Sequence, residues 1–197
     1  MKRAVLILAA LAATPCAALA DLTGRVVRIV DGDTLIVLVE KTRVLVRLDS
    51  IDAPELKQPF GRRSQQSLAE LCAGKIARVI DRGLDRYGRT IGRIACDGVD
   101  ANSEQVRRGM AWVFDRYALR DSPLYWLQGD AQVFRRGLWA DPHPMAPWEW
   151  RRKTRQAQAR TQTFGSATPT SVSRVSIVAS CSSVQPPVPL GRIGTTT

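Results

Sequence analysis

The chain has 197 residues, which is enough for one ordinary domain with flanking segments, and it has a net charge of +11. Most of this excess lies outside residues 21–150, which have a net charge of only +2, because residues 151–197 contain seven Lys or Arg and no acidic residue. The single histidine, His143, excludes mechanisms that need two histidines and argues against a histidine-based zinc hydrolase. Any catalysis must therefore depend on carboxylates and arginines.

Residues 1–20 have the pattern of a secretory signal. Lys2 and Arg3 precede an apolar run at residues 4–13, and Ala18-Leu19-Ala20 forms a cleavage site before Asp21. A retained anchor helix is the alternative, but a membrane span needs about 20 apolar residues and this run is shorter. We therefore expect an exported protein, periplasmic or secreted, with no membrane attachment after cleavage.

The predicted domain, residues 21–150, begins with β-strands. Five segments alternate in polarity or are rich in β-branched residues, and they are predicted to be strands: 23–30, 34–40, 43–51, 75–84 and 90–98. Short turns join the first three strands, and "DRYGR" at 85–89 joins the last two. A helix predicted at 61–75 lies between the third and fourth strands, which is the order of a five-stranded OB-type barrel, although other small barrels fit the same strand count.

About three helices complete a mainly β, α+β fold. Residues 61–75 place Leu68, Leu71 and Cys72 on one side, and 100–109 form a short helix capped by Asp100 or Asn102. A third helix is indicated by apolar residues that recur every three or four positions: Leu124, Leu127, Ala131, Phe134 and Leu138. Trp148 and Trp150 are expected to close the domain. Residues 151–197, which are basic and rich in Ser, Thr and Pro, are predicted to be a disordered tail.

Two cysteines, Cys72 and Cys96, lie within the predicted domain. In an exported domain such a pair is more often a disulfide than two free thiols, and the spacing fits neither a CxxC redox site nor a zinc cluster. This favours a disulfide between Cys72 and Cys96, with free thiols as the alternative. Cys181 in the tail is left as an odd thiol without an assigned role.

Acidic residues follow two of the predicted strands. Asp31 and Asp33 flank Gly32, and Asp52 and Glu55 come after the third strand. In a meander the start of the second strand and the end of the third can lie side by side at one rim, where oxygen ligands suit a hard cation such as Ca²⁺. Turn chemistry also explains an Asp-Gly-Asp sequence without any metal, so both interpretations stay open for this turn.

Arg47, on the third strand, and Arg89, at the end of the "DRYGR" turn, strengthen the hypothesis of a site. A guanidinium group stays charged and can donate two parallel hydrogen bonds to phosphate oxygens. This suits a phosphodiester, whose transition state is more negative than its ground state. The alternative is that both arginines form surface ion pairs.

The ordered set "VDGDT", "RLDSIDAPE", "DRYGR", "VRRGMAWVFDRY" and "RRGLWAD" resembles the staphylococcal nuclease (thermonuclease) family across residues 22–141. The resemblance implies an OB-fold nuclease, a monomer that uses Ca²⁺ to hydrolyse DNA and RNA and leaves 3′-phosphate ends. It implies that Asp33, Asp52 and the Ala53 carbonyl bind Ca²⁺, with Asp31 near the metal. It implies that Arg47 and Arg89 bind the scissile phosphate and that Glu55 orients or deprotonates water. Arg86, Tyr87 and Tyr117 match positions that contact the nucleotide.

Two departures from the family pattern affect these roles. Ala53 replaces a threonine, which matters little because the expected ligand is a carbonyl, and Asp115 replaces an aromatic residue of the nucleotide pocket. The main alternative function is an OB-type module that binds nucleic acid without cutting it, and a third is an exported scaffold with a basic tail. The presence of all five residues, Asp33, Arg47, Asp52, Glu55 and Arg89, favours the nuclease, since a pure binder needs no metal carboxylates.

Overall fold

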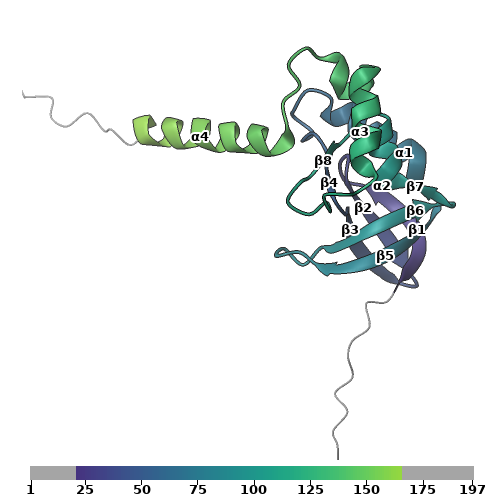
Figure 1. The fold of residues 1–197 in the computed structure, drawn as a ribbon. Coiled ribbons are helices and arrows are strands. Elements are labelled where there is room, and N and C mark those ends of the chain that lie inside the picture. Colours follow the sequence, from purple (N-terminus) through teal and green to yellow (C-terminus); the bar gives the residue numbers. More distant parts are fainter. Residues whose placement is uncertain (1–20, 166–197) are drawn as a thin grey trace, which may run out of the picture. The chain divides into compact units, whose positions relative to one another are not determined.

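The computed structural model describes residues 21–165 (Figure 1), so the predicted signal sequence and Cys181 lie outside the described residues. Eight strands were assigned in this range: β1 Leu22–Ile29, β2 Thr34–Val39, β3 Thr42–Leu48, β4 Ile51–Asp52, β5 Ile76–Leu84, β6 Thr90–Cys96, β7 Val99–Asp100 and β8 Trp112–Val113. The helices of this range are α1 Gly61–Cys72, α2 Ala101–Arg107, α3 Leu124–Val133, the 3₁₀ helix η1 Gly137–Ala140, and α4 Pro147–Gly165.

The five long strands form a closed barrel. The sheet order is β3-β2-β1-β5-β6-β7, and a parallel pairing between β3 and β6 closes the five long strands into a ring (Figure 1). Closure removes the exposed edges that an open sheet would present. The prediction of an α+β fold built on a five-stranded OB-type barrel is confirmed, and α1 lies between the third and fourth long strands as expected.

The register of the strands brings the predicted site residues to one rim. Thr34, directly after Asp33, pairs with Arg47, and Arg47 in turn pairs with Ile91 in β6, two residues after Arg89. The short strands β4 and β8 then pair Asp52 with Trp112. The turn before β2, the end of β3 and the start of β6 are therefore neighbours in space.

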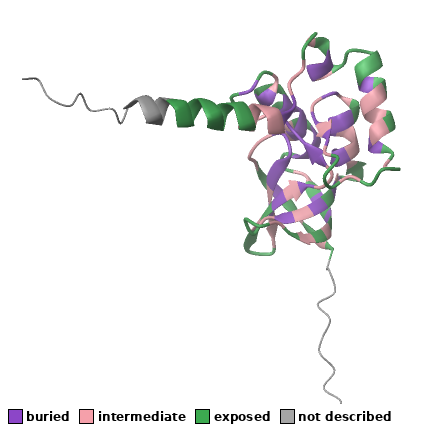
Figure 2. Cartoon of the chain, turned by 60° about the vertical axis from the view of Figure 1, so that its left-hand side comes forward, coloured by how far each residue is buried: buried purple, intermediate pink, exposed green. Residues whose placement is uncertain are grey.

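Alternation along the strands fills the inside of the barrel. Leu35, Val37 and Val46 are fully buried, and Leu48 of β3 and Leu68 of α1 join the same core. Buried residues lie inside the barrel and where the helices pack on it (Figure 2). This burial, at about 25 cal/mol per Å² of apolar surface, is the main stabilisation of the rim that carries the site.

The predicted disulfide is present. Cys72 at the end of α1 bonds to Cys96 at the end of β6, with an S–S distance of 2.03 Å, and both residues are fully buried. The bond therefore ties the helix inserted in the barrel to a strand of the barrel wall.

We expect the double substitution Cys72→Ala/Cys96→Ala to lower the free energy of unfolding by about 3.5 kcal/mol, the loop-closure estimate for a sequence separation of 24 residues. Urea unfolding of the two proteins measures this. Adding a reductant should bring the wild type toward the variant and leave the variant unchanged, and equal midpoints for the two oxidised proteins would contradict the prediction.

The third predicted helix is shorter than its periodicity indicated. α3 ends at Val133, Arg135 has a φ of 48°, and Phe134 is 65% exposed instead of packing in the core. Leu138 is buried, but it belongs to η1, and the backbone N–H of Leu138 donates to the carbonyl of Gly109 at 2.8 Å. A residue in the left-handed conformation ends an α-helix. The apolar spacing in the sequence therefore continues beyond the residue at which the helix ends.

The predicted domain boundary after residue 150 falls inside α4. Contacts divide the chain into a unit that ends at Ala157 and a second unit that begins at Gln158. Trp148 packs on Phe114 with ring centroids 5.4 Å apart, which anchors the first turn of α4 to the domain. Residues 151–157 therefore belong to the domain, and the helix continues to Gly165 in the segment predicted to be disordered.

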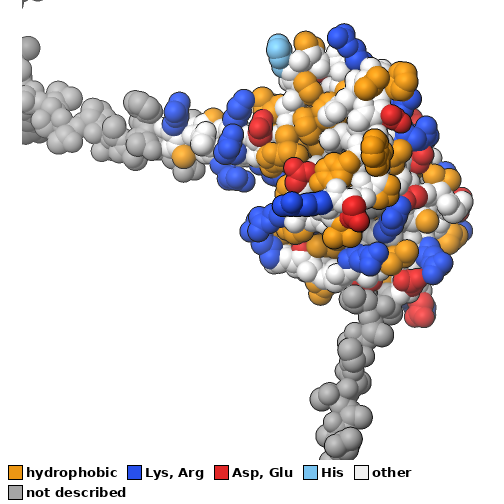
Figure 3. Space-filling view, viewed as in Figure 1, with side chains coloured by type: hydrophobic (Ala, Val, Ile, Leu, Met, Phe, Trp, Pro, Cys, Tyr) orange, Lys and Arg blue, Asp and Glu red, His pale blue; other side chains and the backbone are white. Residues whose placement is uncertain are grey.

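α4 carries five Lys or Arg residues and one acidic residue, Glu149, and blue side chains are prominent on it in Figure 3. Within residues 21–165, no helix combines the length and the apolar character that a membrane crossing requires.

Candidate functional site

The two acids of the Asp-Gly-Asp turn have different environments: Asp31 stabilises the turn, and Asp33 is buried. Asp31 accepts a hydrogen bond from the backbone N–H of Asp33 at 3.0 Å, which is the Asx-turn geometry that turn chemistry predicts. Asp33 is only 3% exposed. Its Oδ1 accepts from the Thr34 hydroxyl at 2.9 Å and its Oδ2 accepts from the Ala53 N–H at 2.8 Å. Turn preference thus accounts for Asp31, but it gives no reason to bury Asp33.

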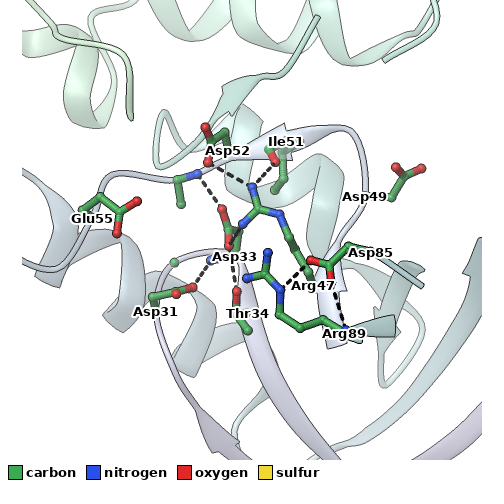
Figure 4. A network of polar contacts seen from close by, with 12 residues as sticks. Asp31, Asp33, Thr34, Arg47, Asp49, Ile51, Asp52, Glu55, Asp85 and Arg89 are labelled. Carbon is green, nitrogen blue, oxygen red and sulfur yellow. Dashed lines mark hydrogen bonds and ion pairs between the residues drawn. The ribbon is translucent and has the colours of Figure 1, made fainter. Parts of the chain in front are cut away.

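Arg47 joins Asp33 to Asp52. Its Nη1 donates to Asp33 Oδ1 at 2.6 Å and its Nη2 donates to Asp52 Oδ1 at 3.0 Å, and the guanidinium lies between the two carboxylates in Figure 4. Asp52 is fully buried, and only 17% of the Arg47 side chain is exposed. The structure therefore brings Asp33, Asp52 and Arg47 together, and the three form a buried cluster rather than a surface ion pair.

Burial and charge act against each other at Asp33. The pKa of this carboxyl is raised from 3.8 to about 6, because desolvation and the neighbouring Asp31 raise it by more than Arg47 lowers it. Burial would also lower the pKa of Arg47, but Asp33 and Asp52 outweigh it and raise that pKa above its ordinary value. The negative charge of this cluster is therefore costly to maintain, and added positive charge would stabilise it.

Arg89 lies at the same rim and reaches it from the β5–β6 turn. Its Nε donates to Asp85 Oδ2 at 2.7 Å, and in Figure 4 its guanidinium points toward Asp33. Partial desolvation raises the pKa of Asp85, but hydrogen bonds from Arg89 and Tyr87 outweigh it, and the pKa lies below its ordinary value. Asp85 fixes one edge of the guanidinium and leaves its terminal nitrogens available for an anion.

Glu55 follows β4 and contacts Arg151, which lies in the segment predicted to be a disordered tail. Arg151 of α4 donates to Glu55 Oε1 at 2.8 Å and to Asp52 Oδ2 at 2.6 Å. Desolvation would lower the pKa of Arg151, but its hydrogen bonds to Asp52 and Glu55 raise it. The signal that could have revealed this residue is Pro147, which is favoured at the first position of a helix and begins α4 four residues before Arg151.

Two buried amides, which the sequence analysis also missed, hold the loops of the site. Gln105 donates from Nε2 to the Gly32 carbonyl at 2.6 Å. Asn102 accepts from the Ile94 N–H at 2.9 Å and donates to the Asp49 carbonyl at 2.9 Å. At Gly32 a Cβ would lie 1.9 Å from the Ser64 hydroxyl, so only glycine allows this close approach. α2 thus positions the loop that contains Gly32 and the loop that contains Asp49.

The three predicted nucleotide-binding residues are exposed near this rim. Arg86 and Tyr87 lie in the β5–β6 turn, where the Arg86 guanidinium stands 4.8 Å from the Tyr87 ring. Tyr117 packs edge-on against Phe114, 5.3 Å between centroids, after β8. Asp115 accepts a hydrogen bond from the Tyr125 hydroxyl at 2.9 Å, and this bond raises the pKa of the phenol. The acid that replaces an aromatic residue is thus held by a partner on α3.

The donor set fits a hard divalent cation in charge and chemistry. Four carboxylates, Asp31, Asp33, Asp52 and Glu55, meet two guanidiniums, Arg47 and Arg151, while Arg89 is paired with Asp85. The two guanidiniums offset two of the four carboxylates, so a net charge of −2 remains. The available ligand atoms are oxygens, which Ca²⁺ prefers. Within residues 21–165, no three acidic, Cys or His side chains converge on one point, since arginines bridge the carboxylates. Metal binding would therefore require the arginine contacts of Asp33 and Asp52 to shift.

Comparison with known proteins places this geometry in context. The family model described as "Staphylococcal nuclease homologue" matches residues 45–141. The chain is 46% identical over 135 residues to an "Uncharacterized endonuclease" of Escherichia coli O157:H7, covering 68% of this chain and 88% of the relative. It is 40% identical over 148 residues to a "Micrococcal nuclease" of Shigella flexneri, covering 70% and 85%. A "Probable staphylococcal-like nuclease CAN1" of Oryza sativa subsp. japonica is 41% identical over 123 residues, covering 62% and 36%.

Proposed function

This chain belongs to the staphylococcal nuclease family and is an endonuclease, and on that premise we propose that it uses Ca²⁺ to hydrolyse DNA and RNA, leaving 3′-phosphate ends. The observation that carries the proposal is the buried Asp33–Arg47–Asp52 cluster, with the guanidinium of Arg89 pointing toward Asp33 (Figure 4). Two arginines beside oxygen ligands for a cation form a place for a phosphate group.

In the proposed reaction, Asp33, Asp52 and the Ala53 carbonyl hold Ca²⁺, with Asp31 supporting the turn behind them. When bound, the cation supplies Lewis acidity and a template for the phosphodiester. Arg47 and Arg89 donate hydrogen bonds to the phosphate oxygens and stabilise the charge that develops on them. Glu55 accepts a proton from the attacking water, and a bond forms between the water oxygen and phosphorus. The bond between phosphorus and the 5′-oxygen breaks, and this oxygen takes up a proton from solvent.

Export to the periplasm or the medium is part of the proposal, and so is a monomeric state. The buried Cys72–Cys96 disulfide supports an oxidising compartment, where such bonds persist. The signal-like residues 1–20 support the same location.

The full chain tests the proposal with single- and double-stranded DNA and RNA, assayed with Ca²⁺ and again with a chelator. We expect cleavage of both nucleic acids with Ca²⁺ and none with the chelator, because the carboxylates lack the cation that binds the phosphate. Fragments should require a 3′-phosphatase before a polymerase can extend them.

A binding module without activity makes the opposite prediction. It would retard the nucleic acid on a gel, in a salt-dependent manner, without producing fragments under any metal condition. Cleavage that persists in the chelator would contradict the metal requirement and leave the endonuclease assignment in place.

A further inference from the structure

Arg151 contacts both carboxylates on which the proposed reaction depends. Its Nη2 lies 2.6 Å from Asp52 Oδ2, and its Nη1 lies 3.2 Å from Asp52 Oδ1 and 2.8 Å from Glu55 Oε1. Asp52 and Glu55 precede Arg151 by 99 and 96 residues in the chain. One guanidinium from the last helix thus bridges a predicted metal ligand and the predicted base.

The backbone of Arg151 is fixed independently of this ion pair. Trp148, three residues earlier and so on the same face of α4, packs on Phe114 and on Trp112, with centroids 5.4 and 5.7 Å apart. Gln58 donates to the Met145 carbonyl just before the helix at 2.7 Å. The guanidinium therefore extends from an anchored turn, which reduces the entropy lost in forming a bidentate contact.

Glu55 depends on Arg151 for its orientation. The Glu55 side chain is 42% exposed on the loop between β4 and α1, and Arg151 is the hydrogen-bonding partner of its carboxylate within residues 21–165. Asp52, in contrast, is also held by Arg47. Loss of Arg151 would leave Asp52 in place and free Glu55 to adopt other rotamers.

We propose that Arg151 is a positioning residue of the nuclease: it holds the Glu55 carboxylate beside Asp52 in the orientation that the reaction uses, an inference that rests on the proposed function. Its charge has a second consequence. Because a cation held by Asp52 lies close to the guanidinium, the two positive charges repel, so Arg151 weakens Ca²⁺ binding while it favours the chemical step. Removing Arg151 should therefore lower kcat and raise the affinity for Ca²⁺.

The full-chain variants Arg151→Ala and Arg151→Lys test this, with Arg152→Ala as the matched control. Arg152 is the next residue of α4, exposed, so its removal changes the charge equally without touching the site. The measurements are kcat and KM on DNA with saturating Ca²⁺, the affinity for Ca²⁺ alone by titration calorimetry, and the melting temperature.

We expect Arg151→Ala to lower kcat at least about tenfold with little change in KM, because displaced catalytic groups cost rate rather than binding. Its affinity for Ca²⁺ should rise severalfold. Arg151→Lys should keep the wild-type Ca²⁺ affinity, since the charge remains, and recover only part of kcat, since one ammonium cannot reproduce the fork. Arg152→Ala should match the wild type in all three measurements.

The proposal is overturned if Arg151→Ala has the kcat of Arg152→Ala, or if Ca²⁺ affinity falls together with kcat. If Arg151→Ala fails to fold, Arg151→Lys decides, and a wild-type kcat in this folded variant overturns the positioning role. A wild type that cleaves no nucleic acid with Ca²⁺ refutes the proposed function itself, which is a different result from an active wild type with an equally active Arg151→Ala.

Discussion

Arg89→Ala is expected to lower kcat by about 10²-fold or more with Ca²⁺ present, the usual cost of losing one preorganised donor to a transition state. The fold should survive this change. The only carboxylate paired with Arg89 among the described residues is Asp85, at 2.7 Å and partly exposed, and such pairs contribute at most about 1 kcal/mol. Steady-state kinetics on DNA, together with urea unfolding, separate the two effects.

Arg89→Lys is the matched control for this prediction. Lysine keeps the charge but presents no planar fork, so we expect a rate between those of Arg89→Ala and the wild type. Wild-type kcat in Arg89→Ala would remove Arg89 from the reaction. A large loss of stability in the same variant would instead show that the β5–β6 turn depends on the Asp85 contact.

Arg47→Ala is expected to be harmful in a different way, because it leaves Asp33 and Asp52 as buried carboxylates without the guanidinium that joins them. Breaking a buried ion pair by removing one partner costs about 3–5 kcal/mol. Ca²⁺ should restore part of this loss, since a ligand that binds only the folded state stabilises it. We also expect kcat to fall by about 10²-fold or more at saturating Ca²⁺, as for Arg89.

Urea unfolding of Arg47→Ala and wild type, each with Ca²⁺ and with a chelator, measures the stability part. The double variant Arg47→Ala/Asp33→Asn is the control, because neutralising Asp33 removes the repulsion between the two acids and should recover stability without restoring kcat. A loss below about 1 kcal/mol, insensitive to Ca²⁺, would mean that the cluster is solvated and not the buried one described here.

These two arginines also show what can be predicted from a sequence. Alternation in residues 34–40 and 43–51 predicts two paired strands, and the short turn between them places Asp33 and Arg47 at one end of the pair. The structure pairs the adjacent Thr34 with Arg47, so this neighbourhood follows from local rules. The sequence likewise favours the Cys72–Cys96 bond, because these are the two cysteines of a domain that is predicted to be exported.

The periodicity of residues 124–138 shows where local reasoning fails. Phe134 has the right spacing for a buried face, yet it is 65% exposed, because the left-handed Arg135 ends the helix and a close contact between Gly109 and η1 redirects the chain. Asn102 and Gln105 were visible as polar residues of a short helix. Nothing in their own segment indicated that they would bind the loops of Asp49 and Gly32.

Hydrophobic periodicity, turn residues and motif spacing act over a few neighbouring positions, so the sequence predicts the five long strands, the helix between the third and fourth of them, the cysteine pair and the residues available for chemistry. Local patterns do not predict that Asp33 is buried beside Asp52, that Arg89 points toward the same place, or that Arg151 belongs to the site. Those facts depend on barrel closure between β3 and β6 and on the packing of Trp148, which join segments far apart in the chain. Burial and the meeting of charges are properties of the assembled fold, so no local pattern encodes them.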